Sequence, residues 1–304
     1  MPIQLPPLSR RRFLKGVLAG AATVTLGPRF TVGAEAEAVD PNRLALLSDI
    51  HVKAEKTALG REINMWDHFQ RVTDEVLAVS PRPCAALVNG DVAFNDGQPG
   101  DYATVVEGLD RIRKGGIPVH LGLGNHDHRA NFLTALPSDD RRVNDVADKC
   151  VSKIKMPHVD WYILDSLDKT KATPGVLGEA QIAWLAKSLD ASTDRAAVVM
   201  VHHQPDDRPI EKRSGLTDTI ALIDAIKPRK QVKALLFGHT HAWSHREVDG
   251  LHFVNLPTTA YVFDATQPAG WVDAKVTEKG ITLQLRSITA NHPKDKEQLE
   301  LAWR

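Results

Sequence analysis

Short apolar runs alternate with amphipathic segments along most of the chain. The apolar runs have the length and composition of buried strands, and they cover residues 44–47, 85–88, 119–123, 161–164, 196–201 and 232–237. Between them, apolar positions recur with helical spacing over residues 66–79, 102–112, 179–189 and 217–226. This alternation predicts an α/β fold in which helices cover the faces of a sheet.

The pattern changes near the C-terminal end. Between residues 243 and 288 the apolar runs are shorter, and the dipeptides Asp249-Gly250 and Lys279-Gly280 separate them. Both dipeptides are consistent with hairpin turns, so antiparallel strands are expected in this part. No internal repeat or flexible linker divides the body, and residues 39–304 are therefore expected to form a single domain.

The first residues form a segment of their own. The string SRRRFLK occupies positions 9–15, a mild apolar stretch follows to residue 27, and small residues close the segment. The apolar stretch is about a dozen residues, too short for a bilayer core of roughly 30 Å. These are the parts of an export signal, and the string resembles the twin-arginine motif. Residues 1–38 are predicted to direct a folded protein to the periplasm or medium through the twin-arginine export machinery. The alternatives are a basic amphipathic N-terminal helix and an uncleaved anchor.

Composition and charge argue against two classes of protein, those inserted in a membrane and those that bind nucleic acid. Apolar residues make up 42% and charged residues 25% of the chain, as in soluble globular proteins, so stable membrane insertion is not expected. Five of the 38 basic residues but one of the 38 acidic residues lie in positions 1–36, which leaves the remainder slightly acidic. A protein that holds nucleic acid by its phosphates usually has a basic excess. Nucleic acid is therefore not an expected partner.

The chain has two cysteines, Cys84 and Cys150, and no C-x-x-C pair. This pattern argues against a cysteine zinc site. An oxidising compartment would permit one disulfide between them. Because Cys84 begins an apolar run, we expect both to be small buried side chains instead.

Residue types that bind metals follow five of these predicted strand ends. The strings are Ser-Asp-Ile-His at 48–51, Asn-Gly-Asp at 89–91, Gly-Asn-His-Asp at 124–127, Val-His-His-Gln-Pro at 201–205 and Gly-His-Thr-His at 238–241. Each string alone is common in turns and loops. Together they occupy the ends of strands, where open α/β sheets gather their sites. Carboxylate, imidazole and amide groups without thiolates suit two divalent or mixed-valence ions of Mn, Fe or Zn.

In this order the five strings resemble the motifs of the calcineurin-like metallophosphoesterases, over about residues 43–256. The resemblance implies a four-layer α/β/β/α sandwich with two metal ions at the strand ends. It assigns one ion to Asp49, His51, Asp91 and His241, and the other to Asp91, Asn125, His202 and His239. Asp91 would bridge the two ions.

The resemblance also implies a reaction, the hydrolysis of small organic phosphate esters by a metal-bridged hydroxide, with diesters favoured over monoesters. His126 would protonate the leaving oxygen or clamp the phosphate, and Asp127 would orient His126. Arg129, His203 and Trp243 are expected to contact substrate, although a surface or packing role is open for each.

The residue at position 94 narrows the branch of the superfamily that the chain resembles. Purple acid phosphatases carry a tyrosine three residues after the bridging aspartate, and this chain has Phe94 there. The strings look most similar to the class III cyclic-nucleotide phosphodiesterase and glycerophosphodiesterase branch. Two alternatives remain open, a nuclease of the same superfamily and a non-catalytic module that binds phosphate ligands.

Overall fold

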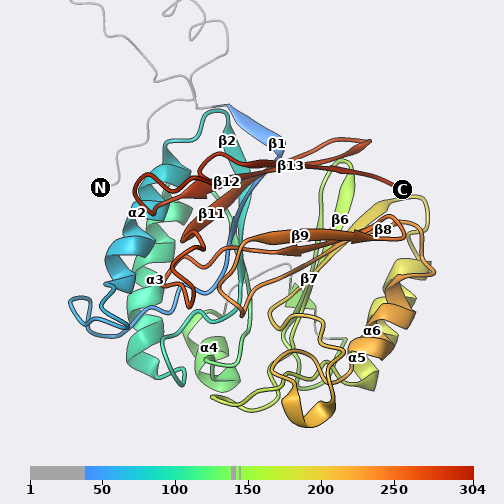
Figure 1. The fold of residues 1–304 in the computed structure, drawn as a ribbon, viewed down its shortest axis with the longest axis horizontal. Coiled ribbons are helices and arrows are strands. Elements are labelled where there is room, and N and C mark those ends of the chain that lie inside the picture. Colours follow the sequence, from blue (N-terminus) through green and yellow to red (C-terminus); the bar gives the residue numbers. More distant parts are fainter. Residues whose placement is uncertain (1–37, 138–141, 144) are drawn as a thin grey trace, which may run out of the picture. The chain divides into compact units, whose positions relative to one another are not determined.

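Two mixed β-sheets form the centre of the computed structural model, which describes residues 38–137, 142–143 and 145–304 (Figure 1). The first sheet contains β1 (Val39–Leu47), β2 (Arg82–Asn89), β3 (Val119–Gly122), β11 (Gly270–Val276), β12 (Gly280–Ser287) and β13 (Gln298–Ala302). The second contains β4 (Arg142–Val143), β5 (Val151–Lys155), β6 (Val159–Leu164), β7 (Ala196–Val201), β8 (Val232–Phe237), β9 (Ser244–Val248) and β10 (Leu251–Asn255). The predicted export signal, apart from residue 38, lies outside the described residues.

The strand order places the parallel strands next to one another in each sheet. The first sheet has the order β13-β12-β11-β1-β2-β3, in which β1, β2 and β3 are parallel. The second has the order β4-β5-β6-β7-β8-β10-β9, in which β6, β7, β8 and β10 are parallel. The carboxyl ends of neighbouring parallel strands share one edge of their sheet, which is the geometry that gathers functional loops.

Helices cover the outer face of each sheet. The described residues contain α2 (Met65–Leu77), α3 (Pro99–Lys114), α4 (Arg129–Ala135), α5 (Glu179–Asp190), α6 (Thr219–Ile226) and a 3₁₀ turn at Ile210–Lys212. Apolar residues of α2 and α3 pack with the first sheet, and those of α5 and α6 pack with the second. A third apolar core fills the space between the sheets. The predicted four-layer α/β/β/α sandwich is confirmed.

Strand β1 explains why the strands read as continuous apolar runs. Ala45 and Leu47 point into the core under α2 and α3, and Leu44 and Leu46 point into the core between the sheets. All four are fully buried. A strand covered on both faces has no polar side, so its sequence does not alternate.

Most predicted elements are present. The strands predicted at 196–201 and 232–237 have these bounds, and Asp249-Gly250 lies between the antiparallel strands β9 and β10. Lys279-Gly280 lies at the turn between β11 and β12, which are also antiparallel. The pattern missed α4, β4, β5 and β13, because each is too short to show a clear periodicity. None of the helices in the described part of the chain is long and apolar enough to cross a membrane.

The two cysteines lie in different cores. Cys150 is buried in the core under α2 and α3, whereas Cys84 is half-buried beside the core between the sheets. No disulfide joins them. The expectation of small packed side chains is confirmed for Cys150, and Cys84 is only partly covered.

Candidate metal centre

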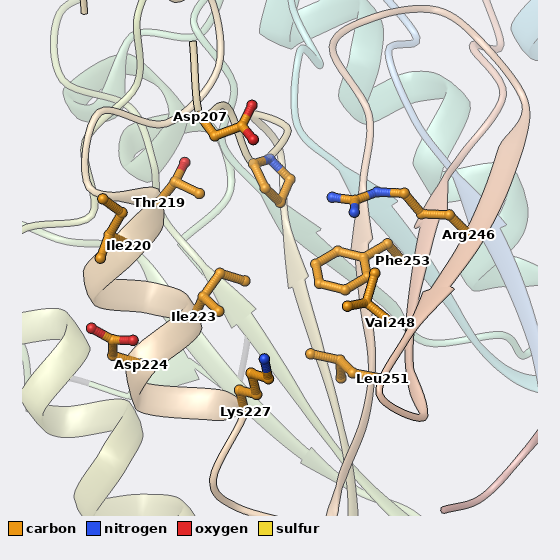
Figure 2. A pocket seen from close by; sticks show the side chains of 11 residues that line it. Asp207, Thr219, Ile220, Ile223, Asp224, Lys227, Arg246, Val248, Leu251 and Phe253 are labelled. Atoms are coloured by element: carbon orange, nitrogen blue, oxygen red, sulfur yellow. The ribbon is translucent and has the colours of Figure 1, made fainter. Parts of the chain in front are cut away.

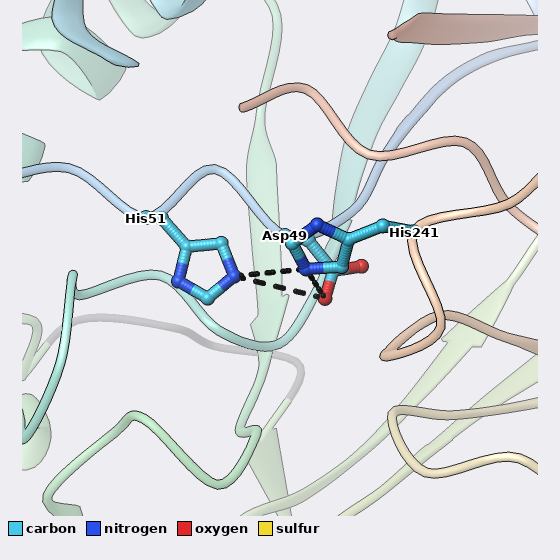
Figure 3. Close-up of side chains that lie close together, drawn as sticks. All are labelled: Asp49, His51 and His241. Atoms are coloured by element: carbon cyan, nitrogen blue, oxygen red, sulfur yellow. Dashed lines mark hydrogen bonds and ion pairs between the residues drawn. The ribbon is translucent and has the colours of Figure 1, made fainter. Parts of the chain in front are cut away.

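Three predicted ligands from two different sheets meet in a first ligand group, Asp49, His51 and His241 (Figure 3). The Nε2 atom of His241 lies 3.3 Å from Oδ1 of Asp49 and 3.1 Å from Nε2 of His51. All three side chains are buried. Two imidazole nitrogens and a carboxylate oxygen that point at one spot form a donor set for a single cation.

A second ligand group lies beside the first and consists of Asp91, His202 and His239. The Nε2 atom of His202 lies 3.2 Å from Oδ2 of Asp91. The same Asp91 oxygen is 3.6 Å from Nε2 of His51, a member of the first group. Asp91 therefore lies between the two groups, where a bridging carboxylate would have to lie.

Five of the seven predicted ligands share an unusual backbone conformation. Positive φ angles of 45° to 67° occur at Asp49, His51, Asp91, His239 and His241. Non-glycine residues adopt this left-handed region at a cost of about 1–3 kcal/mol each, and such residues cluster at functional sites. Backbone hydrogen bonds hold the turns, because the N–H of Asp49 donates to the Gly90 carbonyl and that of His51 donates to the Asp91 carbonyl.

Backbone carbonyls orient three of the imidazoles. Nδ1 of each ring bonds a carbonyl oxygen, in the pairs His51 with Phe94 (3.2 Å), His202 with Asn89 (2.9 Å) and His241 with Tyr261. A carbonyl oxygen only accepts, so Nδ1 must carry the proton in each ring. Nε2 is then the atom presented to the centre, and this second contact is typical of metal-binding histidines.

A buried atom at the centre lacks a partner. Oδ1 of Asn125 has no hydrogen-bond partner among the described residues. An unsatisfied buried polar atom costs about 1–3 kcal/mol, so native structures rarely keep one without a function. Asn125 is a predicted ligand, and a divalent ion would satisfy this oxygen. The residues present therefore fit a metal centre.

Charge at the centre also favours a cation. Burial opposes ionisation of Asp91, yet the imidazoles of His202 and His51 hold its pKa well below its usual value. Burial likewise opposes protonation of His202, but the carboxylates of Asp91 and Asp49 raise its pKa to about 10. Burial lowers the pKa of His51 to about 3. The two carboxylates thus attract positive charge to this point, which a bound metal ion would supply.

Comparison with known proteins agrees with this geometry. The model of the family described as calcineurin-like phosphoesterase matches residues 42–243. The chain belongs to this family. The cyclic adenosine monophosphate phosphodiesterase CpdA of Pseudomonas aeruginosa is 29% identical over 230 residues, 72% of this chain and 77% of that protein. The glycerophosphodiester phosphodiesterase GpdQ of Enterobacter lignolyticus is 23% identical over 265 residues, 79% of this chain and 90% of that protein.

Solved structures support the same fold. A dimetal phosphatase from Danio rerio superposes with a TM-score of 0.67, at 13% identity, over 87% of this chain and all of that one. The similarity at this identity concerns the fold alone. The family match and the phosphodiesterases among its relatives place this calcineurin-like phosphoesterase among the hydrolases that use divalent metals.

His126 of the phosphoesterase faces the centre. Its ring lies 5.0 Å from that of His51, and one of its nitrogens is within 4.8 Å of ligand atoms of His51 and Asp91. Nδ1 donates to the carbonyl of Asn95 (2.8 Å), and the backbone N–H of His126 donates to Oδ1 of Asp91 (2.8 Å). This position suits a group that touches substrate at the metal centre.

The expected contact between Asp127 and the ring of His126 is not formed, and this prediction is corrected. The Asp127 carboxylate is fully buried and accepts hydrogen bonds from the N–H groups of Gly124, Val92 and Ala93 and from the hydroxyl of Tyr102. No hydrogen bond joins it to the His126 ring in the part of the chain that is described. Asp127 instead ties together the loops after β2 and β3. The Gly-Asn-His-Asp string shows the acid beside the histidine but not the donors that surround it.

Arg129 pairs with a buried acidic side chain. Its guanidinium contacts the carboxylate of Asp165 (2.8 Å) and also donates to the Leu167 carbonyl (2.6 Å). Arg129 therefore anchors the start of α4 to the loop after β6. Its expected contact with substrate stays a prediction.

The expected contact of Trp243 with substrate is also corrected. Its side chain is buried in the core between the sheets, and Nε1 donates to Glu297 (2.6 Å). It contributes to packing rather than to a substrate pocket.

His203 is fully buried, with its ring 4.7 Å from that of His239 and Nδ1 2.7 Å from Oγ of Ser166. Its expected contact with substrate stays a prediction.

The sequence patterns missed several side chains at the centre. Tyr261 stacks on His51 with ring centroids 5.2 Å apart, and Phe263 stacks on His241 at 4.3 Å. Both residues lie in the loop between β10 and β11, beyond the last of the five strings. Aromatic residues in a loop carry no spacing signal, so only the folded chain reveals them.

A separate groove lies between α6 and the β9–β10 hairpin (Figure 2). Ile220 and Ile223 line its helix wall, and Arg246 and Phe253 line its strand wall. None of the metal ligands lines this groove. It is therefore distinct from the candidate metal centre.

Proposed function

We propose that this calcineurin-like phosphoesterase is a dinuclear-metal phosphodiesterase that hydrolyses small organic phosphate esters in the periplasm or medium. The observation that carries the proposal is the position of Asp91, within 3.2 Å of His202 and 3.6 Å of His51. One carboxylate between two ligand groups suits two ions better than one.

The chain supplies the ligands from opposite sheets. Asp49, His51 and His241 would hold one ion, and His202 and His239 would hold the other with Oδ1 of Asn125. Asp91 would bind both. Such ions, when bound, neutralise phosphate oxygens and lower the pKa of a water molecule so that it can act as the nucleophile.

His126 would handle the leaving oxygen. Because its Nδ1 donates to the Asn95 carbonyl, its Nε2 is the atom left to meet substrate. In the protonated ring Nε2 donates a proton or a hydrogen bond to the ester oxygen as the P–O bond breaks. The hydrogen bond from the backbone N–H of His126 to Asp91 holds this residue beside the carboxylate proposed to bridge the ions.

A diester is the favoured substrate. CpdA is named as a cyclic nucleotide phosphodiesterase and GpdQ as a glycerophosphodiester phosphodiesterase, so both named activities cleave diesters. The nuclease alternative lacks support, because the chain outside its first 36 residues has no excess of basic residues.

The test is an activity screen of purified protein loaded separately with Mn, Zn or Fe. Metal content is measured first, and bis(p-nitrophenyl) phosphate, p-nitrophenyl phosphate, cyclic nucleotides and glycerophosphodiesters are then compared. We expect two ions per chain, faster hydrolysis of diesters and loss of activity with EDTA. Protein that binds fewer than two ions or prefers monoesters would contradict the proposal, and protein that binds ions but hydrolyses no ester would favour the non-catalytic alternative.

We also propose that residues 1–38 direct export by the twin-arginine route. Arg10 and Arg11 of the string SRRRFLK are the positions that match the paired arginines. The double variant Arg10→Lys/Arg11→Lys should leave the protein in the cytoplasm, whereas Arg29→Lys should be exported normally. Fractionation of cells with an immunoblot measures both, and equal export of the two variants would exclude this route.

A further inference from the structure

Two loops form a rim beside the first ligand group. Arg61 lies in the loop between β1 and α2, and Tyr261 and Phe263 lie in the loop between β10 and β11. We call these three residues the aromatic rim. Met65 and Ala260 pack with Tyr261 in a small apolar cluster that joins the two loops. The rim is therefore a built feature rather than two unrelated loops.

The aromatic rim touches two metal ligands. The rings of Phe263 and His241 stack with centroids 4.3 Å apart and an interplanar angle of 24°. Those of Tyr261 and His51 stack at 5.2 Å and 25°. A phosphate bound at the first ligand group therefore places its ester groups near the rim.

The apolar ring of Phe263 is exposed to solvent beside the first ligand group. It is 55% exposed, and it is the only aromatic residue among the large apolar side chains that are exposed in the described residues. An exposed aromatic ring beside a reaction centre gains stability when a ligand covers it. Scattered exposed leucines and isoleucines elsewhere on the surface carry no such meaning.

Arg61 adds an available cation. Its guanidinium carbon lies 4.9 Å from the ring centroid of Phe263 and 5.4 Å from that of Tyr261. No acidic side chain of the described residues forms an ion pair with it. A guanidinium held over aromatic rings can stack on a planar ligand and donate to acceptor atoms on the ligand's edge.

We propose that the aromatic rim makes the enzyme select phosphodiesters that carry a nucleoside, with its planar heteroaromatic base, over diesters of small polyols. The inference rests on the phosphodiesterase function proposed above. A base offers a π-face and acceptor nitrogens, which Phe263 and Arg61 can both use. A glycerol group offers hydroxyls instead, and the Phe263 ring provides no hydrogen bond for them.

The experiment uses the full metal-loaded chain and the variants Phe263→Ala, Phe263→Trp and Arg61→Ala. Steady-state kinetics are measured with 3′,5′-cyclic adenosine monophosphate and with glycerophosphocholine, and binding of adenosine 5′-monophosphate is measured by calorimetry. Ile220→Ala is the matched control, because Ile220 is also exposed but lies on α6.

We expect Phe263→Ala and Arg61→Ala to raise KM for the cyclic nucleotide and Kd for the monophosphate by roughly three- to tenfold, which is the size of an aromatic contact. The KM for glycerophosphocholine should stay unchanged, and Phe263→Trp should retain the wild-type KM for the cyclic nucleotide. Equal changes for both substrates, no change for either, or a wild-type preference for glycerophosphocholine would each overturn the inference.

Calorimetry separates this inference from the proposed function. If the wild type hydrolyses neither ester, the phosphodiesterase proposal fails, and weaker binding of the monophosphate by Phe263→Ala would still support a base-binding rim. A wild type that does not bind the monophosphate overturns the rim as well.

Discussion

The two sheets contribute different chemistry to the candidate metal centre. The loops after β1, β2 and β3 supply both carboxylates and the amide, with the ligands Asp49, His51, Asp91 and Asn125. The loops after β7 and β8 supply only imidazoles, from His202, His239 and His241. The first sheet therefore sets the negative charge that would attract cations, and the second would complete their coordination.

The sheets also differ in how they make room for each other. In the loop after β8, Gly238 leaves no space for a side chain, since a Cβ there would collide with Ser48 and Asp49 of the first sheet. In the loop after β3, a Cβ at Gly124 would collide with Asp91 of its own sheet. The second sheet is thus fitted around the carboxylates of the first, and substitutions on the two sides should have unequal effects.

The largest difference is expected between Asp91→Ala and His239→Ala. Asp91 lies between both ligand groups, so its loss should remove both ions and lower kcat/KM by about a thousandfold or more. His239 belongs to one group, so its loss should leave about one ion per chain. Metal analysis and hydrolysis of bis(p-nitrophenyl) phosphate test both variants, with the exposed Asp190→Ala as the control. Full activity of Asp91→Ala would refute the assigned centre.

His126→Ala tests whether the first sheet supplies more than ligands. We expect kcat to fall by about a hundredfold or more, because the proton donor at the leaving oxygen is lost, while both ions remain bound. Metal content and kcat are measured on the same preparation. Since His126 lies within 4.8 Å of His51 and Asp91 ligand atoms, loss of an ion would instead identify it as a ligand.

Gly238→Ala tests the fit of the second sheet around Asp49. The added methyl group must displace Ser48 or Asp49, so we expect metal affinity to fall by about tenfold through the first ligand group. The control is Gly178→Ala, since Gly178 has a φ of 85° but no atom near its Cβ position. The control should lose stability without losing metal affinity, and titration with a metal indicator reads the difference. Equal affinities would show that the loop adjusts.

Tyr102→Phe should have the smallest effect. Its hydroxyl donates to Asp127 (3.0 Å) and accepts from the His128 N–H (2.8 Å), both within the loops of the first sheet. Loss of these buried hydrogen bonds should lower the free energy of unfolding by about 1–3 kcal/mol while both ions stay bound. Urea denaturation measures the change. Tyr162→Phe, which removes one longer bond to Ser188 (3.3 Å), is the matched control and should lose less.

The sequence by itself predicted the ligand set because the signals for these residues are local. Each ligand follows an apolar strand by one to four positions, so the strand pattern and the ligand string are read from the same short segment. The same holds for the hairpins at Asp249-Gly250 and Lys279-Gly280, where the turn residues lie between the paired strands. Local chemistry and periodicity determine features of this kind.

Only the tertiary structure decided which neighbours these residues meet. Trp243 donates a hydrogen bond to Glu297, which lies 54 positions away in the sequence. Arg129 pairs with Asp165, which lies 36 positions away. The stacking of Phe263 on His241 likewise depends on how the loop after β10 returns to the sheet edge. Such contacts follow from chain packing rather than from spacing. The sequence therefore predicted the ligand chemistry, and the fold decided which surrounding side chains lie at the candidate metal centre.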